Sequence, residues 1–324
     1  MSKALGILSG GLDSSLAALC LKRQGIEVTA IAFVTPFFGS SKAEQAARQM
    51  DIPLIIEDIS DVHLEMVKNP RYGYGKNMNP CIDCHAMMFR LAGEIMVASG
   101  FDFLFSGEVL GQRPMSQNAN ALRSVAKTSG HPDRILRPLS AKLLPVTSME
   151  EQGLVDREQL LDIQGRSRKR QEALAREWQL TDFPSSGGGC LLTEIHFSDR
   201  LRDLFNHQPE CTVNDVELLK VGRQFRLSER AKLALGRHQN DNDAIRELAS
   251  SDQIILRTPG IPGPLGLVSG EPSDHDLKTA GAILASYGKG KDLPEIEILA
   301  EMPGEEQRFI VAPMLREESQ KLIV

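Results

Sequence analysis

Hydrophobic residues in the first hundred positions occur in short runs separated by amphipathic segments. Strands are predicted for the apolar runs Lys3–Leu8, Val28–Val34, Pro53–Glu57 and Phe101–Phe105. Helices are predicted between them, at Asp13–Gln24, Ser41–Met50 and Cys81–Ser99. This alternation indicates an α/β fold, a Rossmann-like, doubly wound parallel sheet whose ligand crevice lies at the carboxyl ends of the strands. The segment Asp58–Pro80 predicts a long loop, and loops of this length usually have a function.

The pattern changes in the second half of the chain. A charged, helical stretch runs from Met149 to Trp178, and Phe183–Cys190 interrupts it because proline and three glycines do not continue a helix. Beyond Phe205, strand and helix patterns are mixed, which is typical of a smaller α+β domain. We therefore predict an α/β domain over residues 1–200 and an α+β domain over residues 201–324.

A glycine-rich motif follows the first predicted strand and opens the first predicted helix. It consists of Ser9, Gly10, Gly11, Leu12, Asp13, Ser14 and Ser15. Two adjacent glycines at a helix N-terminus leave backbone N–H groups open to a phosphate, and the three serines add hydroxyl donors. The Lys-Ser/Thr ending of a Walker A loop is absent, and Asp13 suits a Mg²⁺ ion beside the phosphates. The alternative is a tight turn followed by an N-cap.

Three cysteines lie in contexts that indicate chemistry. Cys81 and Cys84 are one turn apart at the start of a predicted helix, where the helix dipole is expected to lower the thiolate pKa, and Cys190 ends a glycine run. Three thiolates suit an iron–sulfur cluster with one open iron. A redox pair of Cys84 and Cys190, or a zinc site completed by His85, remains open. The odd total of five cysteines argues against a disulfide framework, and Cys20 is expected in the core.

The charge distribution limits how this chain binds nucleic acid. A net charge of −6 excludes binding through the overall field, so any RNA contact is local. Two basic segments are candidates, with Arg166, Arg168, Lys169 and Arg170 in the first and Arg223, Arg226 and Arg237 in the second. The alternative is two solvated faces. The sequence shows no signal peptide and no apolar run of membrane-spanning length, so we expect a cytoplasmic protein with no membrane partner.

The glycine-rich motif resembles the signature of the PP-loop (N-type) ATP pyrophosphatases at every fixed position: Ser9, Gly10, Gly11, Asp13, Ser14 and Ser15. This resemblance implies binding of ATP and Mg²⁺, cleavage of ATP to AMP and pyrophosphate, and activation of a carbonyl oxygen as an adenylate. Cys84 and Cys190 correspond to the two cysteines of bacterial tRNA 2-thiouridylases, which implies that they are catalytic together with Asp13. In such enzymes a strand end like that at Gly107 lines the nucleotide pocket.

With Cys81 added, the three cysteines resemble those of thiolases that hold a [4Fe–4S] cluster, which would make Cys81, Cys84 and Cys190 its ligands. The stretch Lys220–Asn242 resembles the RNA-binding domain of the NFACT proteins. The implied function is ATP-dependent thiolation of tRNA or another RNA, with sulfide or a persulfide carrier as sulfur donor. A PP-loop ligase or amidotransferase acting on a small molecule, and a non-enzymatic RNA-binding protein, are the alternatives.

Overall fold

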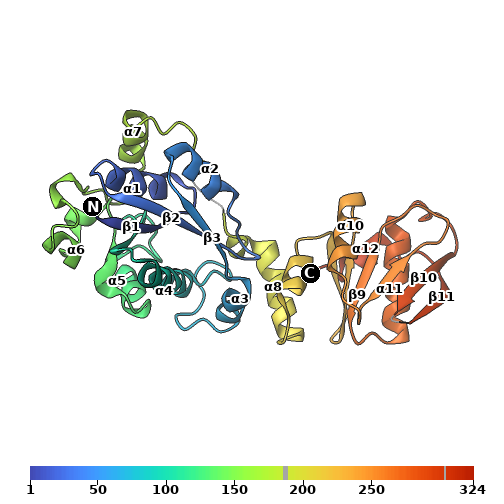
Figure 1. The fold of residues 1–324 in the computed structure, drawn as a ribbon. Coiled ribbons are helices and arrows are strands. Elements are labelled where there is room, and N and C mark those ends of the chain that lie inside the picture. Colours follow the sequence, from blue (N-terminus) through green and yellow to red (C-terminus); the bar gives the residue numbers. More distant parts are fainter. Residues whose placement is uncertain (185–188, 303) are drawn as a thin grey trace. The chain divides into compact units, whose positions relative to one another are not determined.

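The computed structural model describes residues 1–184, 189–302 and 304–324, and it divides into two compact units, Met1–Thr193 and Glu194–Val324 (Figure 1). The boundary expected between residues 200 and 201 lies inside helix α8 (Ile195–His207). This helix belongs to the second unit because Arg200 donates to the carbonyl of Leu219 at 3.0 Å and Asp203 binds Arg226.

The first unit is built on a parallel sheet in the order β3-β2-β1-β4-β5, as predicted for a doubly wound fold. Its strands are β1 (Lys3–Ile7), β2 (Glu27–Val34), β3 (Leu54–Asp58), β4 (Phe103–Ser106) and β5 (Ile135–Leu136). The strand order reverses between β1 and β4, which is where such sheets bind ligands. The glycine-rich motif follows β1 and Gly107 follows β4, so both lie at this point.

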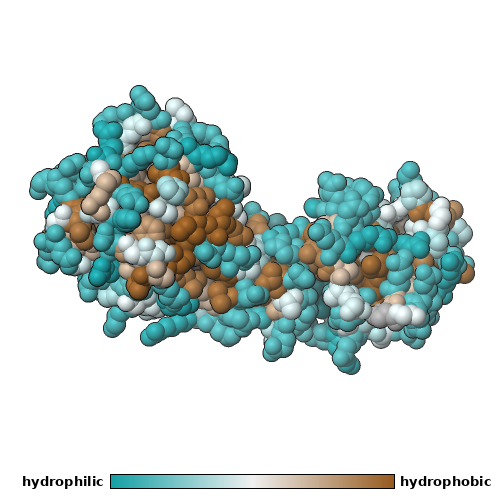
Figure 2. All heavy atoms as spheres, viewed as in Figure 1, coloured by the Kyte–Doolittle hydropathy of each residue, from teal (hydrophilic) through white to brown (hydrophobic). Residues whose placement is uncertain are grey.

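Helices cover both faces of this sheet (Figure 1). They are α1 (Leu12–Lys22), α2 (Ser41–Met50), α3 (Ser60–Lys68), α4 (Cys81–Ser99), α5 (Ala119–Thr128), α6 (Ser148–Glu151) and α7 (Lys169–Glu177). Ala4 packs in a core with Leu16 of α1, whereas the next residue, Leu5, packs in a second core with Phe89 of α4. Successive strand residues point to opposite faces, so a strand buried on both faces is apolar throughout. Figure 2 shows an apolar area over β2 and β3, surrounded by polar side chains.

Two predicted elements of the first unit are wrong. The segment Asp58–Pro80 contains helix α3, which forms because His63, Leu64 and Val67 bury one face of it. The stretch from Met149 to Trp178 contains the short helix α6, a 3₁₀ turn and α7 instead of continuous helix. Gly153 and Gly165 break it, since both adopt positive φ angles, of 70° and 81°.

The second unit is an α+β domain, as predicted. Its sheet has the order β11-β10-β8-β9-β7-β6, and all its pairs are antiparallel. The strands are β6 (Arg223–Ser228), β7 (Ala231–Leu235), β8 (Ile254–Arg257), β9 (Gly266–Gly270), β10 (Ile296–Met302) and β11 (Glu305–Val311). The helices are α8, α9 (Val213–Leu218), α10 (Gln239–Leu248), α11 (Asp274–Tyr287) and α12 (Arg316–Gln320). Within the described residues, no helix has the length and apolar character needed to span a bilayer.

Candidate functional site

The two glycines of the motif differ in whether the fold itself requires glycine at their positions. Gly10 has a φ of +73°, and a Cβ there would lie 2.2 Å from the carbonyl carbon of Lys42, so only glycine fits against the start of α2. A Cβ on Gly11 would meet only the hydroxyl of Ser9, at 3.4 Å. Packing therefore requires Gly10, whereas the space beside Gly11 is open.

The hydroxyls of the motif stabilise the turn before α1. Ser14 Oγ and Ser15 Oγ donate to the carbonyl of Gly11 at 2.9 and 3.2 Å, and both residues are buried. Ser9 Oγ lies 3.2 Å from Ser14 Oγ. These bonds fold the turn in advance of any ligand, and the predicted contacts of the serines with phosphate stay a prediction.

Asp13 carries an unsatisfied oxygen at the start of α1. Gln112 Nε2 donates to Asp13 Oδ2 at 2.6 Å, and Gln171 Nε2 donates to Gln112 Oε1 at 3.0 Å. Asp13 Oδ1 is buried and has no hydrogen-bond partner among the described residues. A buried carboxylate oxygen without a partner is costly, and a hard cation such as Mg²⁺ would satisfy it. The residues present therefore fit the magnesium ion that the motif implies.

Gly107, which follows β4, is in close backbone contact with the first turn of α1. A Cβ on Gly107 would lie 2.4 Å from the backbone nitrogen of Ser14 and 2.5 Å from the carbonyl carbon of Asp13. Close packing of β4 against the start of α1 thus explains this glycine without a nucleotide. Its predicted contact with adenine stays a prediction.

The structure brings the three selected cysteines together. Helix α4 begins at Cys81, and the segment carrying Cys190 is bound to the residues before that helix. Met78 N donates to the carbonyl of Leu192 at 3.2 Å, and Asn77 Nδ2 donates to the carbonyl of Thr193 at 2.7 Å. Charge on Cys190 or Cys81 would raise the pKa of Cys84, so the three thiols lie within electrostatic range of one another.

The expected lowering of the thiolate pKa is wrong. Burial raises the pKa of Cys81, raises that of Cys84 well above its usual value, and raises that of Cys190 to about 11. Desolvation of a buried thiolate outweighs the helix dipole here, so the thiols are protonated at neutral pH. Cys81 Sγ donates to Asn79 Oδ1 at 3.0 Å, and Cys84 Sγ lies 3.3 Å from His63 Nε2.

The side chains of the three cysteines and His85 are not arranged as a preformed cluster or zinc site. In the part of the chain that the structure describes, no group of three or more His, Cys, Asp or Glu residues has the arrangement to hold a metal ion. His85, the alternative zinc ligand, places Nδ1 2.8 Å from Glu108 Oε1. The sulfur chemistry of these residues is therefore that of free thiols.

Sequence reasoning missed a buried ionic group beside the cysteines. Glu108 binds His85 through one oxygen, and its other oxygen accepts from Arg137 Nε at 2.9 Å and Ser106 Oγ at 3.2 Å. Burial alone would raise the pKa of Glu108, but Arg137 and His85 lower it to about 2. The sequence offered one sign of this ion pair, a charged residue after each of two apolar segments. Glu108 closely follows β4, and Arg137 directly follows β5.

The segment after β4 reaches both halves of the site. Gln112 binds Asp13 of the glycine-rich motif. Burial raises the pKa of Cys81 and Cys190, and the positive charge of the next residue, Arg113, offsets part of this rise. Consecutive residues therefore contact the glycine-rich motif and act on the thiols, so the two halves of the candidate site are adjacent.

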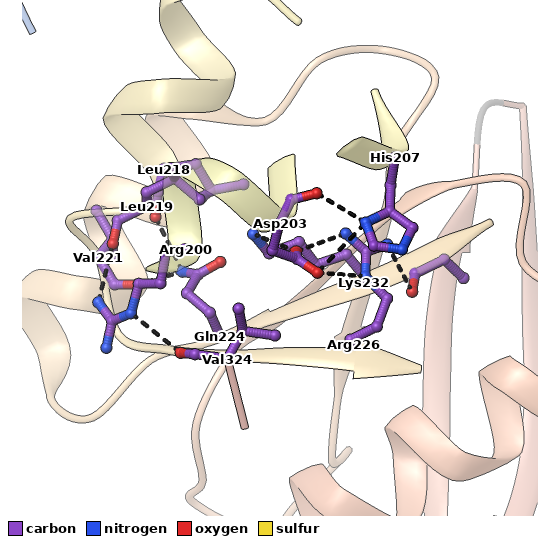
Figure 3. A network of polar contacts seen from close by, with 11 residues as sticks. Arg200, Asp203, His207, Leu218, Leu219, Val221, Gln224, Arg226, Lys232 and Val324 are labelled. Atoms are coloured by element: carbon purple, nitrogen blue, oxygen red, sulfur yellow. Dashed lines mark hydrogen bonds and ion pairs between the residues drawn. The ribbon is translucent and has the colours of Figure 1, made fainter. Parts of the chain in front are cut away.

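Several of the predicted RNA-binding residues form ion pairs within the protein. Figure 3 shows Arg226 and Lys232 directed at Asp203, and Arg226 binds both oxygens of that carboxylate, at 3.1 and 2.6 Å. Arg226 therefore forms an ion pair within the fold. Others are also paired, Arg237 with Asp241 at 2.9 Å and Arg170 with Asp162 at 2.6 Å. RNA contact by this set, with Arg166, Arg168, Lys169 and Arg223, stays a prediction.

Comparison with known families separates the two units. Residues 1–142 match the family described as thiamine biosynthesis protein (ThiI), and residues 222–323 match the NFACT protein RNA binding domain. A tRNA-specific 2-thiouridylase of Desulfosudis oleivorans is 38% identical over 86 residues, 25% of this chain and 24% of the relative. A probable tRNA sulfurtransferase of Staphylococcus aureus (strain MRSA252) is 28% identical over 144 residues, 42% of this chain and 34% of the relative.

The chain thus spans 24% and 34% of the length of these two curated relatives. A solved 4-thiouridine synthetase–RNA complex with bound ATP aligns with 55% of this chain and 52% of its own, at 19% identity and a TM-score of 0.35, too low for a structural conclusion. The two family matches agree with the resemblances found in the motifs: residues 1–142 are similar to the ThiI family, and residues 222–323 are similar to the NFACT RNA-binding domain.

Proposed function

We propose that this chain is an ATP-dependent tRNA sulfurtransferase that forms AMP and pyrophosphate. The observation that carries the proposal is the segment that places Gln112 on Asp13 and Arg113 near Cys81 and Cys190. A phosphate-binding motif next to a group of thiols suits an enzyme that activates a carbonyl and then replaces its oxygen by sulfur. The relatives, a tRNA-specific 2-thiouridylase and a probable tRNA sulfurtransferase, support tRNA as the substrate.

The first half-reaction takes place at the start of α1. The nucleobase carbonyl oxygen attacks the α-phosphorus of ATP, and pyrophosphate leaves, so that an adenylate forms on the base. The open side of Gly11 and the positive end of α1 receive the phosphates. Asp13 Oδ1 would hold Mg²⁺, which neutralises phosphate charge when bound. Adenylation is needed because a carbonyl oxygen is a poor leaving group.

The second half-reaction uses Cys84 and Cys190. Cys84 Sγ gives up its proton to solvent and attacks the terminal sulfur of a persulfide donor, whose S–S bond breaks and whose thiolate leaves. The sulfur now carried on Cys84 attacks the adenylated carbon while the carbon–oxygen bond breaks and AMP leaves. Cys190 then loses its proton to solvent, and its thiolate attacks Cys84 Sγ and breaks the S–S bond to the transferred sulfur. The thiolated base departs, and the resulting Cys84–Cys190 disulfide is reduced by an external thiol. Arg113 supplies the positive charge that favours the thiolates of Cys81 and Cys190.

The test combines the purified chain with tRNA, ATP, MgCl₂, a reductant and a persulfide donor. Pyrophosphate release and thionucleosides are measured, the latter by mass spectrometry. Asp13→Ala is expected to lose both products, whereas Cys84→Ala and Cys190→Ala lose thionucleosides and keep pyrophosphate release. Cys20→Ala is the matched control, because Cys20 is buried in α1 and bonded to the carbonyl of Gln159. A parent protein that forms no thionucleoside in any tRNA would refute the proposal.

The same preparations decide between a thiol carrier and a cluster. The mechanism above predicts a parent protein without iron after anaerobic reconstitution. Iron that is bound by the parent and lost in each of the variants Cys81→Ala, Cys84→Ala and Cys190→Ala would make the cluster the sulfur carrier and refute the disulfide step. Adenylation at Asp13 would survive that outcome, because it depends on separate residues.

A further inference from the structure

Residues 71–76 form an exposed segment between α3 and α4, which we call the aromatic loop (Figure 1). Its sequence is Arg-Tyr-Gly-Tyr-Gly-Lys, and all six residues are exposed. The loop contains two of the three tyrosines of the chain, Tyr72 and Tyr74, which are 42% and 41% exposed. It carries two cations and no acidic residue. Core packing does not account for two aromatic rings in this position.

The fold holds this loop at several points. Asp83, buried in the first turn of α4, accepts the backbone N–H groups of Arg71 and Tyr72 at 3.2 and 2.9 Å. Gly75 N donates to the carbonyl of Asn79 at 2.8 Å, which closes the other end. The loop is therefore organised before any partner binds, and binding costs little conformational entropy.

The tyrosine hydroxyls are also fixed. Tyr74 Oη donates to the carbonyl of Val67 at 2.6 Å, and Tyr72 Oη lies 3.0 Å from Thr128 Oγ1. The guanidinium of Arg71 lies 5.7 Å from the centre of the Tyr72 ring. Each ring is bound at its polar end while much of the residue stays accessible, and a cation stands beside one of them.

We propose that the aromatic loop is a stacking platform for unpaired nucleobases of RNA, next to the thiols. Proteins that bind single-stranded RNA stack bases on aromatic side chains and neutralise the backbone with Lys and Arg. This loop supplies both in six residues, without acids that would repel phosphate. The proposal rests on the proposed function in one respect, that RNA is the substrate.

The position of the loop gives the platform a role in the reaction. Asp83 lies between Cys81 and Cys84 in the sequence, and its carboxylate holds the start of the loop. A base stacked on Tyr72 or Tyr74 is therefore bound by a segment anchored to the same helical turn as the two thiols. The platform would unstack bases of a tRNA loop and hold the strand where the target carbonyl meets the sulfur.

The test uses fluorescence anisotropy with a labelled single-stranded RNA oligonucleotide, a labelled RNA duplex and unmodified tRNA. The double variant Tyr72→Ala/Tyr74→Ala is expected to weaken single-strand binding about 5- to 150-fold for each stack lost. The matched double variant Tyr72→Phe/Tyr74→Phe keeps the rings and is expected to bind within a few-fold of the parent. Duplex binding is expected to change little. Urea unfolding followed by the fluorescence of Trp178 checks that each variant is folded.

The outcomes separate this proposal from the proposed function. Equal single-strand affinities for the parent and the alanine variant, in a protein that thiolates tRNA, would overturn the platform alone. Equal losses in the phenylalanine and alanine variants would also overturn it, because hydroxyl anchoring and not stacking would then explain the loss. A parent that binds single strands through the rings but transfers no sulfur would refute the proposed function and retain the platform.

Discussion

Replacing Glu108 by Gln is expected to destabilise the first unit at neutral pH. The loss of stability is expected to shrink as the pH is lowered. The pKa of Glu108 is lowered to about 2 in the folded protein from a usual value of 4.5, because Arg137 and His85 outweigh the cost of burial. A difference of this size corresponds to about 3 kcal/mol of unfolding free energy. Because the folded pKa is depressed, the contribution is fully present above about pH 4.5 and is lost as the pH falls toward 2.

The assay is urea unfolding followed by tryptophan fluorescence between pH 7 and pH 2.5. Trp178 is the only tryptophan of the chain and packs against the core of the first unit, so its emission reports this unit alone. In a separate thermal melt at pH 7, the unfolding midpoint of Glu108→Gln should lie about 6–12 °C below that of the parent. The matched control is Glu94→Gln, because Glu94 pairs with Arg90 on the surface of α4 and exposed pairs contribute less than about 1 kcal/mol.

A second variant tests the cause of this effect. Adding Arg137→Met to Glu108→Gln removes the buried cation that the first change leaves without a carboxylate. The double variant should therefore lose less stability than the sum of the two single variants. A pH-independent gap between Glu108→Gln and the parent, or additive losses, would refute the ionic explanation.

Three further changes have equally defined outcomes. Gly10→Ala should destabilise the first unit more than Gly25→Ala in urea unfolding, because both have positive φ angles but only Gly10 lacks room for a Cβ; equal losses would exclude the clash. Lys232→Met should stabilise the second unit in circular dichroism melts at pH 7 and lose this advantage above about pH 10.5, because burial lowers the pKa of Lys232 to about 8 and penalises its charged form. Arg223→Gln should reduce the salt dependence of tRNA binding with a loss of stability of about 1 kcal/mol or less, because its guanidinium lies 4.7 Å from the centre of the Tyr287 ring. Arg226→Gln should lower stability more, since its guanidinium binds both oxygens of Asp203.

Local patterns in the sequence were enough to predict the parallel sheet and the turn between β1 and α1. Strand, glycine turn and helix are consecutive there, so neighbouring residues determine the structure. Helix α3 was missed because it is short and is followed by Pro70 and two glycines, which read as a continuous loop. Its helical face is set by burial of His63 and Val67 in the fold.

The charges of the site depend on tertiary structure. Glu108 and Arg137 are 29 residues apart and meet only because β4 and β5 are adjacent strands. The thiol pKa values were predicted with the wrong sign because the helix dipole is visible in the sequence, whereas the burial of Cys84 is not. The sequence predicted which cysteines gather but not that they gather as protonated thiols.

The contact between Gly107 and the start of α1 has a consequence for how this sequence can vary. No side chain lies between these two backbones, so the distance from the glycine-rich turn to the segment that carries Gln112 and Arg113 does not depend on any rotamer. Under the proposed function, substitutions at those two positions would leave the spacing of the two half-reactions unchanged. Position 107 itself has no such freedom, because any Cβ there would push the end of β4 away from the start of α1.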